Sequence, residues 1–289
     1  MRNLCLFWYY FLMQIKNHED ILCESIYSSV MEKMSNICQD IDKDYIMRKL
    51  GTRESFLKSI CLLPYWFFSC FENETSIDIQ NELFILGKAN LQAWIAYTLY
   101  DYIRDGKIEK EKINVCLSIA NIFYQKSIKD FYTVIDNQTD KIHIINNLLN
   151  TIDNHYLDNR VIKDIHYHFK YMCDSSYKKS IGASIVALII TWLLGNKTDS
   201  TNHVETFEFF KNYFNARQLS DDEDDMVDDM LHNIYTPATF LMRAQYGSDY
   251  IHTMMRSRID MSMRLALENL RNLSFFDYEK FMELYVKEC

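Results

Sequence analysis

The pattern of apolar and polar positions along this chain has a helical period almost throughout. Apolar residues recur every three or four positions, and short polar breaks separate the segments. The predicted helices cover residues 3–16, 19–40, 54–71, 77–104, 110–134, 139–153, 158–173, 177–195, 203–231, 238–257 and 259–287. Pro64 is expected to kink its helix or to start a new one. The pattern therefore predicts an all-α fold of about ten helices.

Composition supports this prediction and bears on the domain organisation. The 289 residues include only 6 Gly and 2 Pro, so turn and hairpin signals are few. Hydrophobic residues make up 48% of the chain, enough for a sizeable core, and no low-complexity linker or internal repeat interrupts it. We therefore expect one all-α domain over residues 1–289.

The charge balance and the cysteines restrict the class of partner and the compartment. A net charge of −9 and a pI near 5.4 argue against a nucleic-acid surface, which would need clustered Lys and Arg. The 8 cysteines are scattered and form no C-x-x-C pair. They favour a reduced cytoplasm with inert thiols over a disulfide framework or a zinc site.

Two apolar runs resemble membrane segments but are short. Leu4–Met13 spans ten residues and Ile181–Leu194 spans fourteen, whereas a spanning helix needs about 20. No small-residue cleavage site follows the first run, which argues against a signal peptide. We expect two buried core helices and no transmembrane segment. The sequence leaves peripheral membrane contact and a homodimer open.

The acidic segment, residues 218–229, is the main chemical feature of the chain. Seven of the nine residues from Asp221 to Asp229 are Asp or Glu, within a predicted helix. Asp221, Asp225 and Asp228 share one helical face, and Asp222 and Asp229 flank it. Because like charges at this spacing each cost a helix roughly 0.2–0.5 kcal/mol, a positive species is expected on that face. Divalent cations that hold a phosphate are the first candidate, and a solvated acidic patch is the alternative.

An EF-hand is excluded for this segment. Its loop needs Gly at the sixth position and Glu at the twelfth, where a loop beginning at Asp221 has Met226 and His232.

A second acidic pair lies at the end of the long helix predicted before Gly106. Asp101 and Asp105 are four residues apart, where the helix dipole disfavours negative charge. By itself the pair could be a simple helix stop. Two antiparallel helices of a bundle could, however, direct this pair and the acidic segment toward one cavity. Mg²⁺ is usually held by one or two carboxylates together with substrate phosphates and water.

These residues resemble the motifs of the trans-isoprenyl diphosphate synthase and terpene synthase superfamily. Its F-Q-x-x-D-D-x-x-D motif is similar to Gln218, Asp221, Asp222 and Asp225, with Arg217 in place of Phe. The D-x-x-E-D motif of phytoene and squalene synthases, with its following Y-x-P, also resembles this helix. The matching residues are Asp225, Asp228, Asp229, Tyr235 and Pro237, with Asp228 in place of Glu.

Two further blocks precede this helix in the order that the superfamily shows. Asp101 and Asp105 are similar to the D-D-x-x-D motif, with Tyr102 at the second Asp, which leaves a D-x-x-x-D spacing. Lys179-Ser180 resembles a Lys-Thr pair whose lysine contacts diphosphate. The resemblance covers roughly residues 81–245, and residues 1–75 carry no recognised motif.

The resemblance implies an isoprenoid-synthase helical bundle around a central cavity. An allylic prenyl diphosphate would bind there with three Mg²⁺ ions. The implied metal ligands are Asp101, Asp105, Asp221, Asp222, Asp225 and Asp229. Lys179, Arg104, Gln218, Tyr97 and Phe214 are the implied substrate-binding residues, the first two at the phosphates and the aromatic rings along the cavity. We expect the catalytic contribution to come mainly from Asp101, Asp105, Asp225 and Lys179.

Three functions are left open by these residues. A second, basic pocket for isopentenyl diphosphate is typical of chain-lengthening synthases, but Gly106 is followed by Lys107-Ile-Glu-Lys-Glu-Lys112 without an Arg pair. This favours a terpene synthase or cyclase that uses one allylic diphosphate. A prenyltransferase that couples prenyl units is the alternative. The third hypothesis is a non-catalytic acidic helical protein, whose degenerate first motif no longer holds metal. Separately, aromatic residues such as Tyr97 and Phe214 could simply fill the core.

The histidines at 166 and 168 do not predict a metal site. They are two residues apart and lie on different helical faces.

Overall fold

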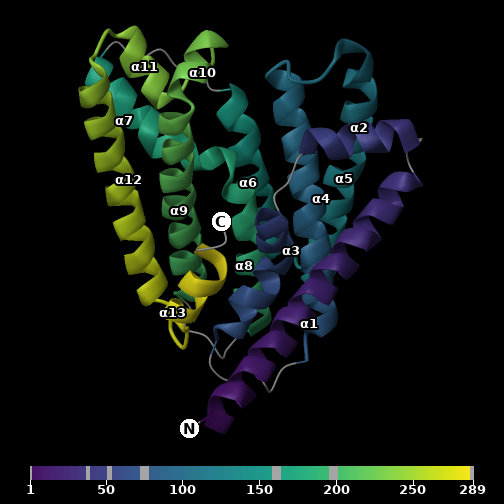
Figure 1. Ribbon diagram of the computed structural model, residues 1–289. Coiled ribbons are helices and arrows are strands. Elements are labelled where there is room, and N and C mark those ends of the chain that lie inside the picture. The colour runs from purple at the N-terminus through teal and green to yellow at the C-terminus, as the bar shows by residue number, and fades with distance from the viewer. Residues whose placement is uncertain are drawn as a thin grey trace. The chain divides into compact units, whose positions relative to one another are not determined.

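The computed structural model describes residues 2–36, 40–50, 54–71, 78–157, 164–194 and 201–286 (Figure 1). Within this part of the chain the structure is all-helical, with 13 α-helices, 86% helical residues and no strands. The predicted all-α fold class is confirmed.

The helices form two compact units, which are described separately. Unit 1 consists of Met1–Gln138 with Asp277–Cys289, and unit 2 consists of Thr139–Phe276. The single domain over residues 1–289 stays a prediction.

Unit 1 is built around α4, which packs against α5, α3 and α1. A buried amide joins two of these helices, because Asn90 donates from Nδ2 to the Ile60 carbonyl at 2.8 Å. The C-terminal segment packs on α3, where the rings of Phe67 and Phe281 lie 5.4 Å apart. The helices are α1 (Arg2–Ser35), α2 (Asp40–Leu50), α3 (Glu54–Ser69), α4 (Gln80–Arg104), η2 (Lys110–Lys112), α5 (Ile113–Val134), α13 (Tyr278–Phe281) and the π-helical turn Met282–Val286.

Three sequence predictions for unit 1 differ from the structure. The helix α1 continues through the break predicted after residue 16, and α2 was not predicted, since its polar sequence has little apolar periodicity. Pro64 lies inside α3 and does not start a new helix. Residues 59–64 are all buried there, so packing on both sides holds the helix together despite the lost backbone hydrogen bond.

Close packing of α4 against α3 and α1 requires a glycine at position 87. A Cβ atom on Gly87 would lie 2.7 Å from the Cys61 carbonyl oxygen and 2.8 Å from Cδ1 of Ile26. Because the nearest atom belongs to the backbone, a larger residue would push α4 away from α3.

We expect Gly87→Ala to lower the free energy of unfolding by about 2–3 kcal/mol, despite the better helix propensity of Ala. Urea unfolding followed by circular dichroism measures the loss. Gly247→Ala is the matched control, because a Cβ there meets nothing within 4 Å. The free energy of unfolding of this control should fall by no more than about 1 kcal/mol, because Gly247 occupies an N-cap position. Equal losses in both variants would contradict the close-packing argument.

Unit 2 is organised around α9, which packs against α12, η3, α8, α7 and α11. Its helices are α6 (Thr139–Leu157), α7 (Ile165–Ser175), η3 (Ser176–Lys179), η4 (Ile181–Ala183), α8 (Ser184–Leu194), α9 (Asn202–Asp224), α10 (Met226–Leu231), α11 (Pro237–Arg243) and α12 (Ser248–Arg271).

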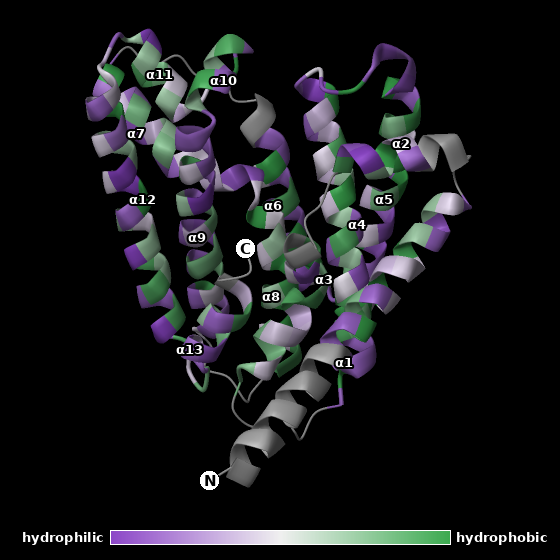
Figure 2. Ribbon diagram, viewed as in Figure 1, coloured by the Kyte–Doolittle hydropathy of each residue, from purple (hydrophilic) through white to green (hydrophobic). Residues whose placement is uncertain are grey.

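The apolar run at 181–194 forms η4 and α8, whose position Figure 2 shows coloured by hydropathy. Residues 184–191 are all buried. The predicted core helix is therefore confirmed. The side chains of Leu4–Met13 are not among those that the structure describes, so their burial stays a prediction. Within the described part of the chain, no single helix is long and apolar enough to cross a membrane, although Ile165–Lys179 and Ile181–Leu194, bent by 46°, pass that test as a pair.

Two predicted boundaries in unit 2 are wrong. The helix predicted over 203–231 divides at Asp225 into α9 and α10. The helix predicted over 238–257 ends at Arg243, and α12 then runs through the break predicted at residue 258. Thr236 fixes the start of α11 by accepting from the Thr239 N–H at 3.2 Å, with Pro237 at the first helical position.

Candidate functional site

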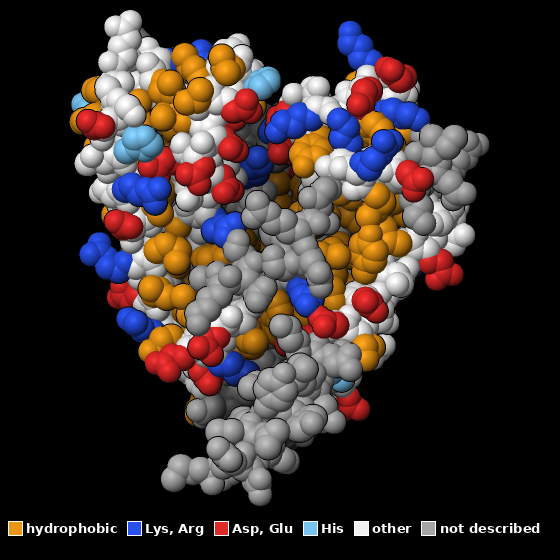
Figure 3. Space-filling view, in the orientation of Figure 1, with side chains coloured by type: hydrophobic (Ala, Val, Ile, Leu, Met, Phe, Trp, Pro, Cys, Tyr) orange, Lys and Arg blue, Asp and Glu red, His pale blue; other side chains and the backbone are white. Residues whose placement is uncertain are grey.

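The acidic segment crosses the junction between α9 and α10. At this junction Asp225 has φ −89° and ψ 4°. Helical hydrogen bonds nevertheless continue, from the Asp225 N–H to the Asp221 carbonyl and from the Asp229 N–H to the Asp225 carbonyl, both at 2.9 Å. The one-face arrangement of Asp221 and Asp225 is therefore kept. In Figure 3, acidic side chains gather over the region of α9 and α10.

Burial divides these acids into two groups. The exposed residues are Asp221, Asp224, Asp225 and Asp228, whereas Asp222 and Glu223 are only 7% and 4% exposed. The sequence did not predict this division, because all seven acids have similar neighbours along the chain.

Glu223 holds α9 to α12. Its carboxylate lies 2.9 Å from Nε of Arg256 and 2.7 Å from Nδ1 of His252. The side chain therefore has a packing role, away from the other acids. No spacing in the sequence linked Glu223 to these partners about thirty residues later.

Asp222 is the most perturbed carboxyl group of the segment. Burial raises its pKa to about 7, against the lowering effects of a hydrogen bond from Gln218 and of the Lys179 charge. The Gln218 Nε2 atom donates to Oδ1 of Asp222 at 2.8 Å. In this environment, additional positive charge nearby would stabilise the ionised form of the carboxyl group.

Lys179 of η3 is close enough to influence two of these acids. Its charge lowers the pKa of both Asp221 and Asp222, although desolvation raises the pKa of Asp221 overall. The charges of Asp225 and Asp229 act in the opposite direction, on Asp221 and Asp222 respectively. Unit 2 thus brings Lys179 and the acidic segment into one electrostatic neighbourhood, although about forty residues separate them in the sequence.

A buried amide of α9 positions the turn that carries Lys179. Asn215 accepts at Oδ1 from the Tyr177 N–H at 3.2 Å, and it donates from Nδ2 to Oγ of Ser262 at 3.1 Å. The side chain is 8% exposed. Asn215 therefore ties η3 and α12 to α9, and sequence patterning gave no sign of this role.

We expect Asn215→Ala to lower the free energy of unfolding by about 2 kcal/mol, because it leaves a buried N–H and a hydroxyl group without their partner. It should also raise the pKa of Asp222, since Lys179 is no longer held nearby. Urea unfolding and a ¹³C carboxyl titration measure the two effects. Asn212→Ala, a half-buried position on the same helix, should leave the Asp222 titration unchanged. An Asp222 titration in Asn215→Ala identical to that of wild type would contradict the positioning role.

The first acidic pair lies in unit 1 at the end of α4, and it already has cationic neighbours. Arg104 contacts Oδ1 of Asp101 at 2.6 Å and Oδ1 of Asp105 at 3.1 Å. The Lys107 Nζ atom lies 3.7 Å from Oδ2 of Asp105. The side chains of Asp101 and Asp105 are 16% and 12% exposed. Both carboxylates contact one guanidinium group, and they do so in a largely covered position.

The predicted aromatic residues lie within ring clusters of their own units. Tyr97 packs against Tyr100 and Tyr124, with ring centroids 6.3 and 5.8 Å apart. Phe214 packs against Phe210 and Tyr213, both at 5.6 Å. Both Tyr97 and Phe214 are half-buried.

His166 and His168, which lie on different helical faces, have different environments. His166 is exposed, whereas His168 is buried and its ring lies 4.8 Å from that of Phe240.

The spacing of the carboxylates can be compared with what a Mg²⁺ site requires. Among the described residues, no three His, Cys, Asp or Glu side chains converge to hold a metal ion. Mg²⁺ needs only one or two carboxylates when substrate phosphates supply further oxygens. Two pairs of carboxylates meet the requirement for one or two carboxylates. Asp101 and Asp105 contact the same cation, and the charge of Lys179 acts on both Asp221 and Asp222.

The chain was also compared with known proteins. No family model and no curated protein matches it.

Proposed function

We propose that this protein is a Mg²⁺-dependent class I isoprenoid synthase that ionises an allylic prenyl diphosphate, as a terpene synthase or cyclase does. The observation that carries the proposal is the meeting of Lys179, Gln218, Asp221 and Asp222 in unit 2. The resemblance assigns these residue types to diphosphate and metal, and the raised pKa of Asp222 indicates a site that favours added positive charge.

In this proposal Asp221, Asp222, Asp225 and Asp229 would be the metal ligands of unit 2, and Asp101 and Asp105 those of unit 1. Bound Mg²⁺ would supply Lewis acidity to the leaving diphosphate. Lys179 would bind phosphate oxygens and offset the charge that develops as the C–O bond breaks. Arg104 would exchange its carboxylate partners for phosphate when substrate arrives.

The aromatic side chains would protect the resulting allylic cation. Tyr97 and Phe214 are half-buried and each belongs to a ring cluster. Aromatic faces attract a cation by about 0.5–2 kcal/mol each and exclude water from it. This would let the enzyme direct the cation toward a hydrocarbon or alcohol.

Incubation with C10, C15 and C20 allylic diphosphates and Mg²⁺ tests the proposal. We expect a hydrocarbon or alcohol product and released diphosphate without isopentenyl diphosphate. Longer prenyl diphosphates that appear only when isopentenyl diphosphate is added would replace the cyclase with the prenyltransferase. Absence of product and of diphosphate release with every substrate would reject both.

The contacts of Arg104 support a second candidate, the non-catalytic helical protein. This side chain already pairs with Asp101 and Asp105, so the first acidic pair has a partner without any metal. On this hypothesis Mg²⁺ and inorganic diphosphate together should not raise the melting temperature. Under the enzyme hypothesis they should raise it by several degrees.

A further inference from the structure

A solvent-open cavity between α7 and α12, within unit 2, has no residue of the acidic segment in its lining. Its volume is about 600 Å³, within the usual range of small-molecule sites. Seven residues line it: Asp164, His166, Tyr167, Phe169, Lys170, Met254 and Arg258. None of them has a part in the proposed reaction.

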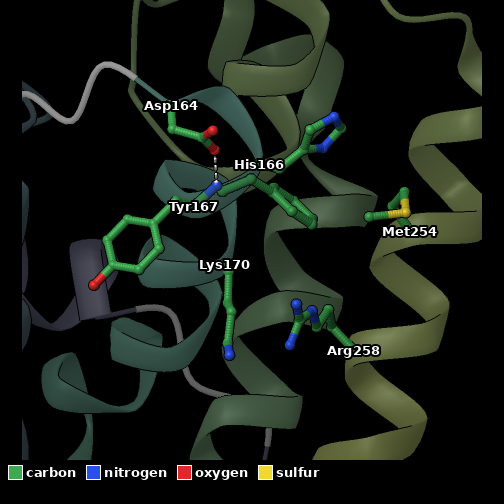
Figure 4. Close-up of a pocket in the computed structure, with 7 residues that line it drawn as sticks. Asp164, His166, Tyr167, Lys170, Met254 and Arg258 are labelled. Atoms are coloured by element: carbon green, nitrogen blue, oxygen red, sulfur yellow. Dashed lines mark hydrogen bonds between the residues drawn. The ribbon is translucent and has the colours of Figure 1, made fainter.

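Two cations from different helices enter this cavity. Lys170 comes from α7 and Arg258 from α12, and Figure 4 shows their charged ends in the same part of the cavity. Lys170 is exposed and makes no ion pair within the described part of the chain. Two neighbouring positive groups on a protein of net charge −9 favour a negative ligand.

Two acids, Asp164 and Asp174, offset part of the charge of this pair but do not occupy all of its hydrogen-bond donors. Asp164 caps α7, accepting at Oδ1 from the Tyr167 N–H at 2.7 Å. Asp174 lies 3.7 Å from Nη1 of Arg258, longer than the 2.7–2.9 Å of a strong charge-assisted hydrogen bond. Hydrogen-bond donors of both Lys170 and Arg258 therefore remain for a ligand.

The rest of the lining is apolar or aromatic. The ring of Phe169 is only 1% exposed and belongs to the hydrophobic core beside the cavity, whereas Met254 is a half-buried, adaptable thioether on the opposite helix. Tyr167 adds a second ring beside Asp164 (Figure 4). A ligand that satisfied the whole lining would combine one anionic head with a hydrocarbon or aromatic body.

We propose that this cavity binds an amphipathic organic anion, whose carboxylate or phosphate contacts Lys170 and Arg258 and whose apolar part lies against Tyr167 and Met254. Both acid types offer oxygens that match an ammonium and a guanidinium group. The site needs neither Mg²⁺ nor an allylic diphosphate, so it stands independently of the proposed reaction.

Isothermal titration calorimetry of the full chain with octanoate, octyl phosphate and octanol tests the proposal. At least one of the two anions should bind, and the neutral alcohol at least tenfold more weakly. The tighter anion identifies the head group. Affinity should fall as NaCl rises from about 0.05 to 0.5 M, because partly exposed charges are screened.

Variants then locate the site. Lys170→Gln and Arg258→Gln should each weaken binding of the anion about tenfold, the effect of losing one charged hydrogen bond. Arg264→Gln is the control, because this exposed arginine lies on α12 outside the cavity. Circular dichroism confirms that each variant is folded. Lys170→Gln removes no ion pair seen in the described part of the chain. The binding result for Lys170→Gln therefore stands even if Arg258→Gln is destabilised.

Three outcomes overturn the proposal: binding of neither anion, equal binding of octanol, or unchanged anion affinity in Lys170→Gln. Asp225→Asn should bind the anion normally. Loss of turnover in Asp225→Asn with retained anion binding would separate the two sites.

Discussion

Asp101→Asn and Asp225→Asn should each lower turnover of an allylic diphosphate by at least about 100-fold, with helical content unchanged. Each substitution keeps the shape of the side chain and removes the negative charge that a hard cation requires. Interactions that stabilise developing charge in a transition state are typically worth about 10²–10³ in kcat each. Diphosphate release, followed at saturating Mg²⁺, gives the measurement.

Asp260→Asn provides the control, because Asp260 is an exposed acid on α12 at a distance in sequence from every proposed ligand. It should leave turnover unchanged. Normal turnover in both Asp101→Asn and Asp225→Asn would reject a metal site made from the two acidic motifs. Loss in Asp225→Asn alone would restrict the site to the acidic segment and remove Asp101 from it.

Asp222→Asn should make the protein more stable at neutral pH, the reverse of the usual effect of a buried substitution. The pKa of Asp222 lies near 7 in the folded state, against an ordinary value of 3.8. The folded protein therefore binds more protons than the unfolded chain between these values, and Asp222 lowers stability as pH rises through this window. Across this pH window, the ionisation of Asp222 lowers the free energy of unfolding by at most about 4 kcal/mol.

The asparagine introduced by this substitution cannot ionise, and its side-chain oxygen can still accept the hydrogen bond from Gln218. Urea unfolding between pH 4 and pH 8 should show wild type and Asp222→Asn nearly equal at pH 4. At pH 8 the variant should be more stable by about 2–4 kcal/mol. Asp228→Asn, at an exposed position, should differ from wild type by no more than about 0.5 kcal/mol at every pH. Parallel curves for wild type and Asp222→Asn would show that Asp222 does not titrate in this window.

The Asp222 result also bears on function. A buried acid that lowers stability at neutral pH is typical of a site where function and stability oppose each other. If Mg²⁺ with diphosphate binds here, it should stabilise wild type more at pH 8, where Asp222 is ionised, than at pH 5. In Asp222→Asn this pH dependence should disappear.

Local sequence was sufficient for the fold class and for much of the helix layout. Helical periodicity and the scarcity of Gly and Pro predicted an all-α chain, and the uniformly apolar residues 181–194 predicted the buried helix α8. These features depend on short-range spacing, which a sequence records directly. One alternative for Pro64, the start of a new helix, was wrong, because α3 continues through this residue and residues 59–64 are buried there.

The sequence by itself determined which chemical groups this protein has and at what spacing: the acids of 221–229, the pair Asp101 and Asp105, and Lys179. Only the tertiary structure decided how those groups differ. It buried Asp222, tied Glu223 to Arg256 and His252, brought Lys179 to the acidic segment and directed Lys170 and Arg258 into one cavity. The physical reason is that the charge state and the partners of a side chain depend on burial and on neighbours from distant helices, which helical periodicity does not encode.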